Sequence, residues 1–172
     1  MFAGWQTFYQ MTGEAAATLT GLLFVIISLV AGREGSVNSN GARLFTSPIV
    51  FHLTSVLVIS GLALAPCGEP HAPIVLITVW SLGAFAYATR NLIGILRMPE
   101  TSHWSDLWFY GVAPFAAYAV MMGAEAGAFL HWPFAIYTVA LSLLGLLLLG
   151  IRNAWDLATF LAPRRSGSQN GS

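Results

Sequence analysis

The stretch Pro133–Asn153, PFAIYTVALSLLGLLLLGIRN, decides the fold class of this chain. It contains no charged residue before Arg152. At a rise of about 1.5 Å per residue, a helix of this length crosses a hydrocarbon layer about 30 Å thick. The apolar residues follow one another without period-two alternation, which favours a helix over a strand of a membrane barrel. The stretch therefore predicts a transmembrane helix.

Four other apolar stretches precede it, and together they predict an all-α, polytopic integral membrane protein with five transmembrane helices. The composition agrees, because 56% of the 172 residues are hydrophobic and only 8% are charged, whereas soluble domains carry about 25% charged residues. In lipid, backbone groups find no water, so the spans must pair their backbone groups internally as helices. The predicted spans are residues 14–32, 48–66, 73–96, 107–127 and 133–153.

The segments outside the spans complete a single domain over residues 1–163. Residues 1–13 carry aromatic side chains at helical spacing and are expected to lie in the outer interface. Residues 154–162 are amphipathic and are expected to extend the fifth helix along the inner interface. Residues 164–172 are polar and are expected to form a disordered cytoplasmic tail. Within the fourth span, Pro114 is expected to kink the helix.

All seven basic residues are arginines, and they lie on one side of the predicted spans. Short loops rich in arginine stay cytoplasmic, which predicts an N-out, C-in orientation in a bacterial-type inner membrane. The formal net charge is zero and the basic residues are scattered, which argues against a nucleic-acid partner. The arginines are Arg33 and Arg43 after the first span, Arg90 and Arg97 at the inner end of the third, and Arg152, Arg164 and Arg165 at or after the inner end of the fifth.

The third and fifth spans begin and end alike. His71-Ala72-Pro73 matches His131-Trp132-Pro133, and the two spans end in Arg90-Asn91 and Arg152-Asn153. This similarity predicts that spans two and three and spans four and five are two parallel copies of one helical hairpin, related by an axis along the membrane normal. Chance similarity between two helices rich in Leu and Ala is the alternative.

An outer layer of acidic residues and histidines, without a basic neighbour, is the first candidate site. Such a group binds a divalent metal ion, attracts cations or titrates as a proton site. Helix capping and a solvated turn explain the same residues structurally, and their distribution over four segments is not a metal-binding motif. The members are Glu14, Glu69, His71, Glu125 and His131.

Glu125 is the hardest of these to explain structurally, because the C-terminal end of a helix disfavours an anion. A carboxylate that reaches toward the interface is the alternative. Together with Glu14, Thr18, Ser28 and His52, it forms a candidate pathway for ions or protons. Hydroxyl groups and a histidine at such positions are also common in ordinary helix packing.

The ends of the duplicated helices form an inner candidate site. Two Arg-Asn pairs brought together are expected to bind an anionic group or a lipid phosphate. Arg152 and Asp156 are four residues apart on one helix and can pair. Arginines that reach the cytoplasmic headgroups are the alternative. The members are Arg90, Asn91, Arg152, Asn153 and Asp156.

No short catalytic motif is present, so the chain is not expected to be an enzyme. The expected function is a small channel or carrier for cations, protons or a small solute. Small residues at Gly13, Ala17 and Gly21 let helices approach closely and favour a homo-oligomer in the lipid bilayer. One alternative is an accessory subunit of a larger respiratory or photosynthetic membrane complex. Another is a haem or metal redox protein, with His71 and His131 as axial ligands, although no cofactor is predicted.

Overall fold

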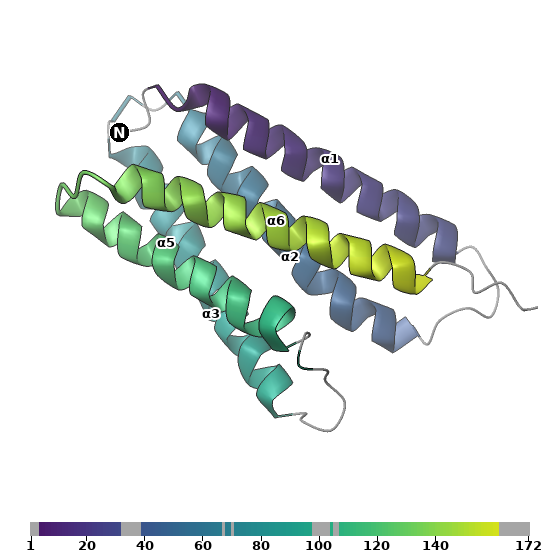
Figure 1. The fold of residues 1–172 in the computed structure, drawn as a ribbon. Helices are drawn as coiled ribbons and strands as arrows, with labels where there is room; N and C mark the ends of the chain where they lie inside the picture. Colours follow the sequence, from purple (N-terminus) through teal and green to yellow (C-terminus); the bar gives the residue numbers. More distant parts are fainter. Residues whose placement is uncertain are drawn as a thin grey trace, which may run out of the picture.

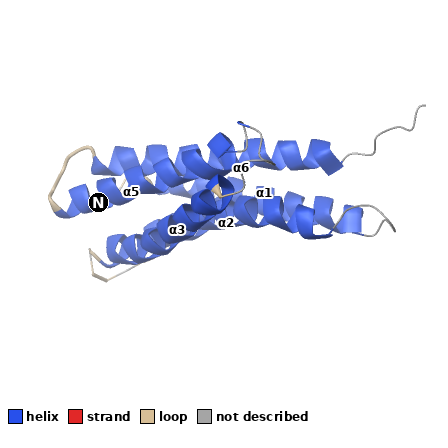
Figure 2. Ribbon diagram, turned by 90° about the horizontal axis from the view of Figure 1, so that it is seen from below, coloured by secondary structure: helices blue, strands red, loops and turns tan. Residues whose placement is uncertain are grey.

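The protein is an all-helical bundle, as predicted (Figure 1). The computed structural model describes residues 4–31, 39–66, 68–69, 71–97, 104 and 107–161. All the secondary structure in these residues is helical, as Figure 2 shows, and they contain no strand. The helices are α1 (Gln6–Ala31), α2 (Ser39–Leu64), α3 (Ala72–Leu96), α5 (Ala113–Phe129) and α6 (Ala135–Leu161), and the π-helical segment η1 (Leu107–Val112) leads directly into α5.

Four helical segments are long and apolar enough to cross a membrane. They are Gln6–Ser28, Ala72–Leu96, Leu107–Phe129 and Ala135–Thr159, and the apolar part of α2, Pro48–Leu64, is shorter. Phe24, Val79 and Leu141 illustrate the outward faces of these helices, since each is more than 60% exposed. Apolar side chains turned outward along whole helices suit contact with lipid. The structure thus supports a membrane protein.

The helices extend beyond the predicted spans at several ends. Helix α1 begins at Gln6, so residues 6–13 are helical and continuous with the first predicted span. The ring of Trp5 contacts Tyr137 of α6 edge-on, with ring centroids 5.1 Å apart, and this contact holds the start of α1 against the bundle. The predicted tail, residues 164–172, and Arg33, Arg164 and Arg165 lie outside the described residues, as does the side chain of Arg43.

Helix α2 lies at the centre of the packing, because α1, α3 and α6 all contact it, while α5 packs on α3 and α6. Two glycines allow close contacts with α2. A Cβ atom at Gly150 of α6 would lie 2.6 Å from Cδ2 of Leu53, and one at Gly13 of α1 would lie 3.1 Å from Cβ of Ser60. Gly13 thus packs inside the protomer, whereas Gly21 has open space beside it.

The two ends of the bundle differ in their polar residues. The starts of α1 and α6 and the end of α5 lie together (Figure 1), at the end that carries His71 and His131, which we call the histidine end. The opposite end carries Arg90, Arg97 and Arg152, and we call it the arginine end. The core between the two ends is largely apolar, with fully buried side chains such as Ile59, Ile77, Met121 and Leu143. Glu125 and His52 are among the few buried polar residues in this core, and they define the candidate site.

Candidate functional site

One face of α5 carries two side chains that bring polar groups into the core, Tyr118 and Glu125. Pro114, Tyr118, Met121 and Glu125 are all buried, and their spacing of three and four residues places them on one side of the helix. Tyr118 and Glu125 are two helical turns apart, about 10 Å along the axis. This face therefore presents two polar positions to the neighbouring helices at different depths.

The Glu125 carboxyl group lies inside the bundle. The side chain is 0% exposed, and its Oε1 accepts a hydrogen bond of 2.6 Å from the hydroxyl of Ser81 on α3. Its Oε2 is buried and has no hydrogen-bond partner among the described residues. Thr78, one turn before Ser81, places its hydroxyl beside the same carboxyl group while it donates to the Ile74 carbonyl oxygen at 2.8 Å. A buried carboxyl with one unsatisfied oxygen is uncommon and marks a candidate site.

His52 and Tyr118 form the second buried polar pair. His52 is 1% exposed, and its Nδ1 lies 3.1 Å from the Tyr118 hydroxyl oxygen, so α2 and α5 are joined by a hydrogen bond. Its Nε2 is buried without a partner among the described side chains and backbone groups. The ring of Tyr87 on α3 lies near it, with centroids 6.4 Å apart. His52 thus has one bonded and one unsatisfied nitrogen inside the bundle.

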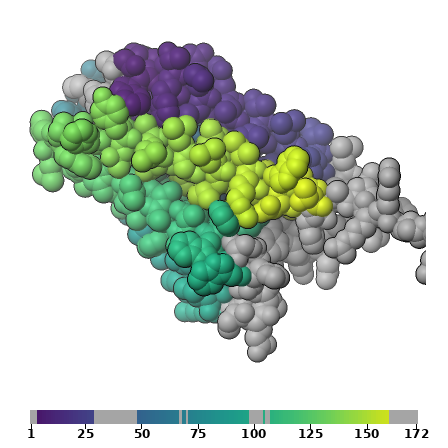
Figure 3. Space-filling view, viewed as in Figure 1, coloured from purple at the N-terminus to yellow at the C-terminus, as the bar shows by residue number. Residues whose placement is uncertain are grey.

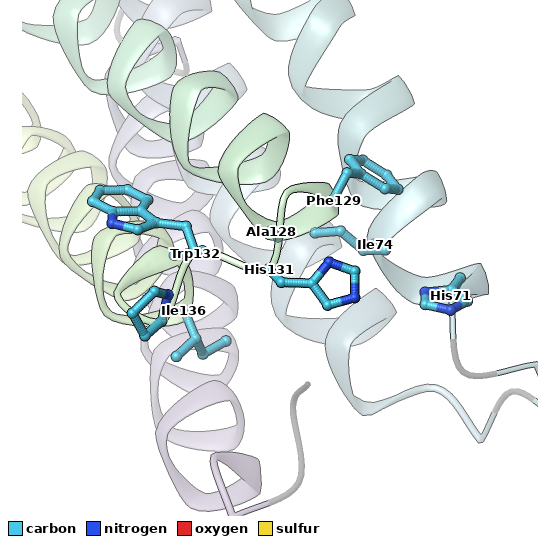
Figure 4. A pocket seen from close by; sticks show the side chains of 9 residues that line it. His71, Ile74, Ala128, Phe129, His131, Trp132 and Ile136 are labelled. Atoms are coloured by element: carbon cyan, nitrogen blue, oxygen red, sulfur yellow. The ribbon is translucent and has the colours of Figure 1, made fainter.

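A cavity of about 430 Å³ opens at the histidine end, between the start of α3, the end of α5 and the start of α6. Figure 4 shows the His131 ring projecting from the α5–α6 turn toward the start of α3, where His71 stands. Aromatic and aliphatic side chains form the walls, with Phe129, Trp132 and Ile136 among them. Apart from the two imidazoles and the Trp132 indole, the described residues that line the cavity have apolar side chains.

His131 adopts an unusual backbone conformation. Its φ of 59° is the only positive value at a non-glycine residue among the described residues. The amide of Trp132 donates to the Gly127 carbonyl at 2.8 Å and the amide of His131 to Ala128 at 3.1 Å, which is the Schellman pattern at the end of α5. The Trp132 ring covers Gly127, where a Cβ atom would lie 2.8 Å from Cε3. Glycine is the usual residue at the left-handed position of this motif.

The predicted outer layer is brought together only in part. His71 and His131 share the cavity, and Glu125 lies deeper inside the bundle. Glu14 is exposed on α1, where it accepts a hydrogen bond from Gln10 at 2.9 Å, and Glu69 is exposed in the α2–α3 turn. Within the described part of the chain, no three His, Cys, Asp or Glu side chains are grouped to hold a metal ion.

The predicted pathway residues divide in the same way. His52 and Glu125 are buried in the core, whereas Thr18 and Ser28 lie on the exposed side of α1. The hydroxyls of Thr18 and Ser28 donate to backbone carbonyls of their own helix, those of Glu14 and Phe24, both at 2.8 Å. These two hydroxyls are satisfied within α1 and do not line the interior.

At the arginine end, the two asparagines stabilise a break in the helix. Pro114 has no amide hydrogen to donate. Another residue at this position would donate to the Tyr110 carbonyl in an α-helix or to the Phe109 carbonyl in a π-helix. Asn91 Nδ2 donates to the Tyr110 carbonyl at 3.1 Å, and Asn153 Nδ2 donates to the Phe109 carbonyl at 3.2 Å. Instead of a simple kink at Pro114, the chain forms η1, and the side chains of Asn91 and Asn153 each donate to one of its carbonyls.

The neighbouring arginines have different environments. Arg152 Nη1 pairs with Asp156 at 2.9 Å, as the four-residue spacing predicted. Its guanidinium also lies over the Phe109 ring, with Cζ 3.4 Å from the centroid, and Nη1 donates to Asn153 Oδ1 at 3.3 Å. Arg90 is exposed. Arg152 is therefore integrated into the fold, while Arg90 points to the surroundings of the bundle.

The partners of Glu125 and His52 were not predicted from the sequence. The spacing of Pro114, Tyr118, Met121 and Glu125 was the available signal, because it defines one face of a helix, but it does not identify the helix that this face contacts. No protein-family model, curated protein or solved structure matches the chain. The geometry of the buried carboxyl group is therefore the basis for a function.

Proposed function

We propose that the protein is a small membrane channel or carrier in which Glu125 takes up and releases a proton or a small cation. The observation that carries this proposal is the fully buried carboxyl group, with Ser81 on one oxygen and no described partner on the other. An ionised carboxylate in a low-dielectric interior is strongly disfavoured without a counter-charge. Glu125 therefore needs a proton or a cation. If it takes up that ion from one side of the membrane and releases it to the other, the protein transports the ion.

His52 and Tyr118 are the proposed second station, nearer to the arginine end. Imidazole and phenol groups both donate and accept protons in hydrogen-bonded chains. Because Tyr118 and Glu125 lie on one face of α5, a shift of that helix moves both stations together. The distance of about 10 Å between them along α5 requires bridging water or such a movement.

The orientation, duplication and oligomeric state belong to the same proposal. The one-sided arginines support an N-out, C-in protein in a bacterial-type inner membrane. The duplicated hairpin is supported by the equivalent roles of matching residues, since both histidines line one cavity and Asn91 and Asn153 both donate to η1. The exposed Gly21 of α1 leaves a surface where a second copy can approach closely.

The test is ion flux into liposomes that contain the purified protein, measured with a pH-sensitive dye and with sodium and potassium gradients. The Glu125→Gln variant keeps the side-chain shape and the hydrogen bond from Ser81 but cannot ionise. We expect it to reduce the flux by at least about tenfold. Glu14→Gln is the matched control, because that carboxyl group is exposed, and it is expected to keep the wild-type rate. Absence of flux for every ion, or equal rates in the two variants, would reject the proposal.

An accessory subunit of a larger membrane complex is the second candidate function. Figure 3 shows α1 along one edge of the molecule, and Met11, Phe24 and Val25 on this helix are each more than half exposed. Such a surface suits a neighbouring subunit as well as lipid. Native mass spectrometry after gentle extraction separates the two cases, because a homo-oligomer favours the channel and foreign subunits in fixed stoichiometry favour the accessory role.

A haem-binding role is favoured by one observation, the presence of His71 and His131 around one apolar cavity. Two imidazoles can serve as the two axial ligands of a haem iron, and this cavity offers two. Purified protein mixed with haem should then give the absorption spectrum of a six-coordinate, low-spin haem. A spectrum equal to that of free haem would remove this candidate.

A further inference from the structure

We propose that the cavity lined by His71 and His131 is the port through which protons reach Glu125 from the histidine end. This inference rests on the proposed function and narrows it in two ways. It selects the proton over other cations, and it identifies the entry side and the residues that deliver the proton.

The cavity lies one helical turn from the carboxyl group on two helices. On α5, Ala128 lines the cavity and follows Glu125 by three residues, and on α3, Ile74 lines the cavity and precedes Thr78 by four. Residues three and four apart are neighbours on a helix surface. Thr78 lies between the cavity and the Glu125 carboxyl group, because its hydroxyl lies beside that carboxyl group and donates to the carbonyl of Ile74, which lines the cavity. A proton thus needs to pass only one layer of side chains between the cavity and Glu125.

The lining of the cavity suits protons better than metal ions. No carboxylate is among the described residues that line it, so these residues offer a sodium or potassium ion no counter-charge and no set of side-chain oxygen ligands. Imidazole takes up and releases protons near neutral pH more readily than other side chains do. Among the described residues that line the cavity, His71 and His131 are the titratable ones. Glu69, the acidic residue nearest to His71 along the chain, is exposed in the preceding turn.

The backbone at His131 supports a role for its imidazole. A left-handed residue that is not glycine is strained, and such strain is concentrated at functional sites. Glycine at this position would satisfy the same Schellman motif without the strain. The side chain that occupies the position instead projects into the cavity (Figure 4).

The experiment measures proton uptake into liposomes with three single variants. His131→Gly removes the imidazole without disturbing the turn, and His71→Asn removes the other imidazole. We expect each to slow uptake by about tenfold, which is at the lower end of what a lost proton-transfer group causes. Glu69→Gln is the matched control, since it changes an exposed titratable residue beside the cavity without lining it, and it should keep the wild-type rate.

Free imidazole provides the decisive measurement. The space left in His131→Gly admits a small imidazole molecule, so millimolar imidazole should restore uptake in this variant and leave the wild type unchanged. If His71→Asn and His131→Gly both keep the wild-type rate while Glu125→Gln has lost uptake, the port is wrong and the proposed function stands. If Glu125→Gln keeps the wild-type rate, the proposed function fails and the port fails with it. Slow uptake in His131→Gly that imidazole does not restore also rejects the port, because the lost side chain then acts in another way.

Discussion

At the scale of single residues, the backbone conformation of His131 can be considered apart from the role of its imidazole. Its φ of 59° is easy for glycine, whereas a residue with a Cβ atom in this conformation is less stable by about 1 kcal/mol. The hydrogen bonds given above for this turn join backbone groups, so they do not depend on which side chain residue 131 carries. The conformation therefore requires no imidazole, and the identity of this residue must be explained by what the imidazole contacts.

We predict that His131→Gly raises the free energy of unfolding by about 1 kcal/mol, because the left-handed strain is removed. Thermal unfolding in detergent micelles is the measurement. His131→Ala is the control, since its Cβ atom keeps the strain, and it should show no gain. A gain of stability together with slower proton uptake would mean that the side chain is kept for function. A loss of stability in His131→Gly would instead show that the imidazole stabilises the turn.

At the scale of elements, the junction of η1 and α5 depends on side chains from two other helices. Pro114 brings no backbone amide to this junction, and the side chains of Asn91 and Asn153 donate to the carbonyls of Tyr110 and Phe109. A buried carbonyl without a hydrogen bond typically lowers stability by about 1–3 kcal/mol. The two asparagines thus fix α3 and α6 to the break.

Asn91→Ala and Asn153→Ala are each expected to lower the free energy of unfolding by about 1 kcal/mol. Arg90→Ala is the neighbouring control, because Arg90 is exposed, and it should have a much smaller effect. The same substitutions can be repeated in a Pro114→Ala background. The new amide at residue 114 then donates either to the Tyr110 carbonyl, as in an α-helix, or to the Phe109 carbonyl, as in a π-helix. The effect of one asparagine variant, not both, should then shrink. Unchanged effects of both would contradict the assigned hydrogen bonds.

The same elements show what the sequence could predict. Hydropathy located the apolar part of each helix, because a hydrocarbon layer demands long apolar stretches. It did not locate all the helix ends, since α1 begins at Gln6 and α2 at Ser39, before the predicted starts at residues 14 and 48. It placed the start of α1 too late, since Phe8 and Tyr9 continue the helix through packing against the bundle. It identified Glu125 and His52 as candidates because both are polar residues within predicted spans, where such residues are uncommon. Their partners Ser81 and Tyr118 depend on which helices touch, and apolar periodicity carries no such information in lipid.

At the scale of the whole molecule, the two ends of the bundle differ in charge. Arg90, Arg97 and Arg152 lie at one end, while His71 and His131 lie at the other. The chain order of the spans predicts this separation. The folded bundle keeps it, because α3 and α6 each have a histidine at or before the start and an arginine near the end. The port proposed for protons thus opens on the side away from the arginines.

The orientation of the protein can be tested independently of transport. We predict that a membrane-impermeant maleimide labels a Glu69→Cys variant in intact cells, because the histidine end is expected to face outward. An Arg97→Cys variant should be labelled only after the cells are permeabilised. Both positions are exposed, so reactivity reports the side of the membrane and not burial, and Cys67→Ser in both variants removes the single native cysteine. Labelling of Arg97→Cys alone in intact cells would reverse the orientation, and the cavity with its two histidines would then take protons from the cytoplasm.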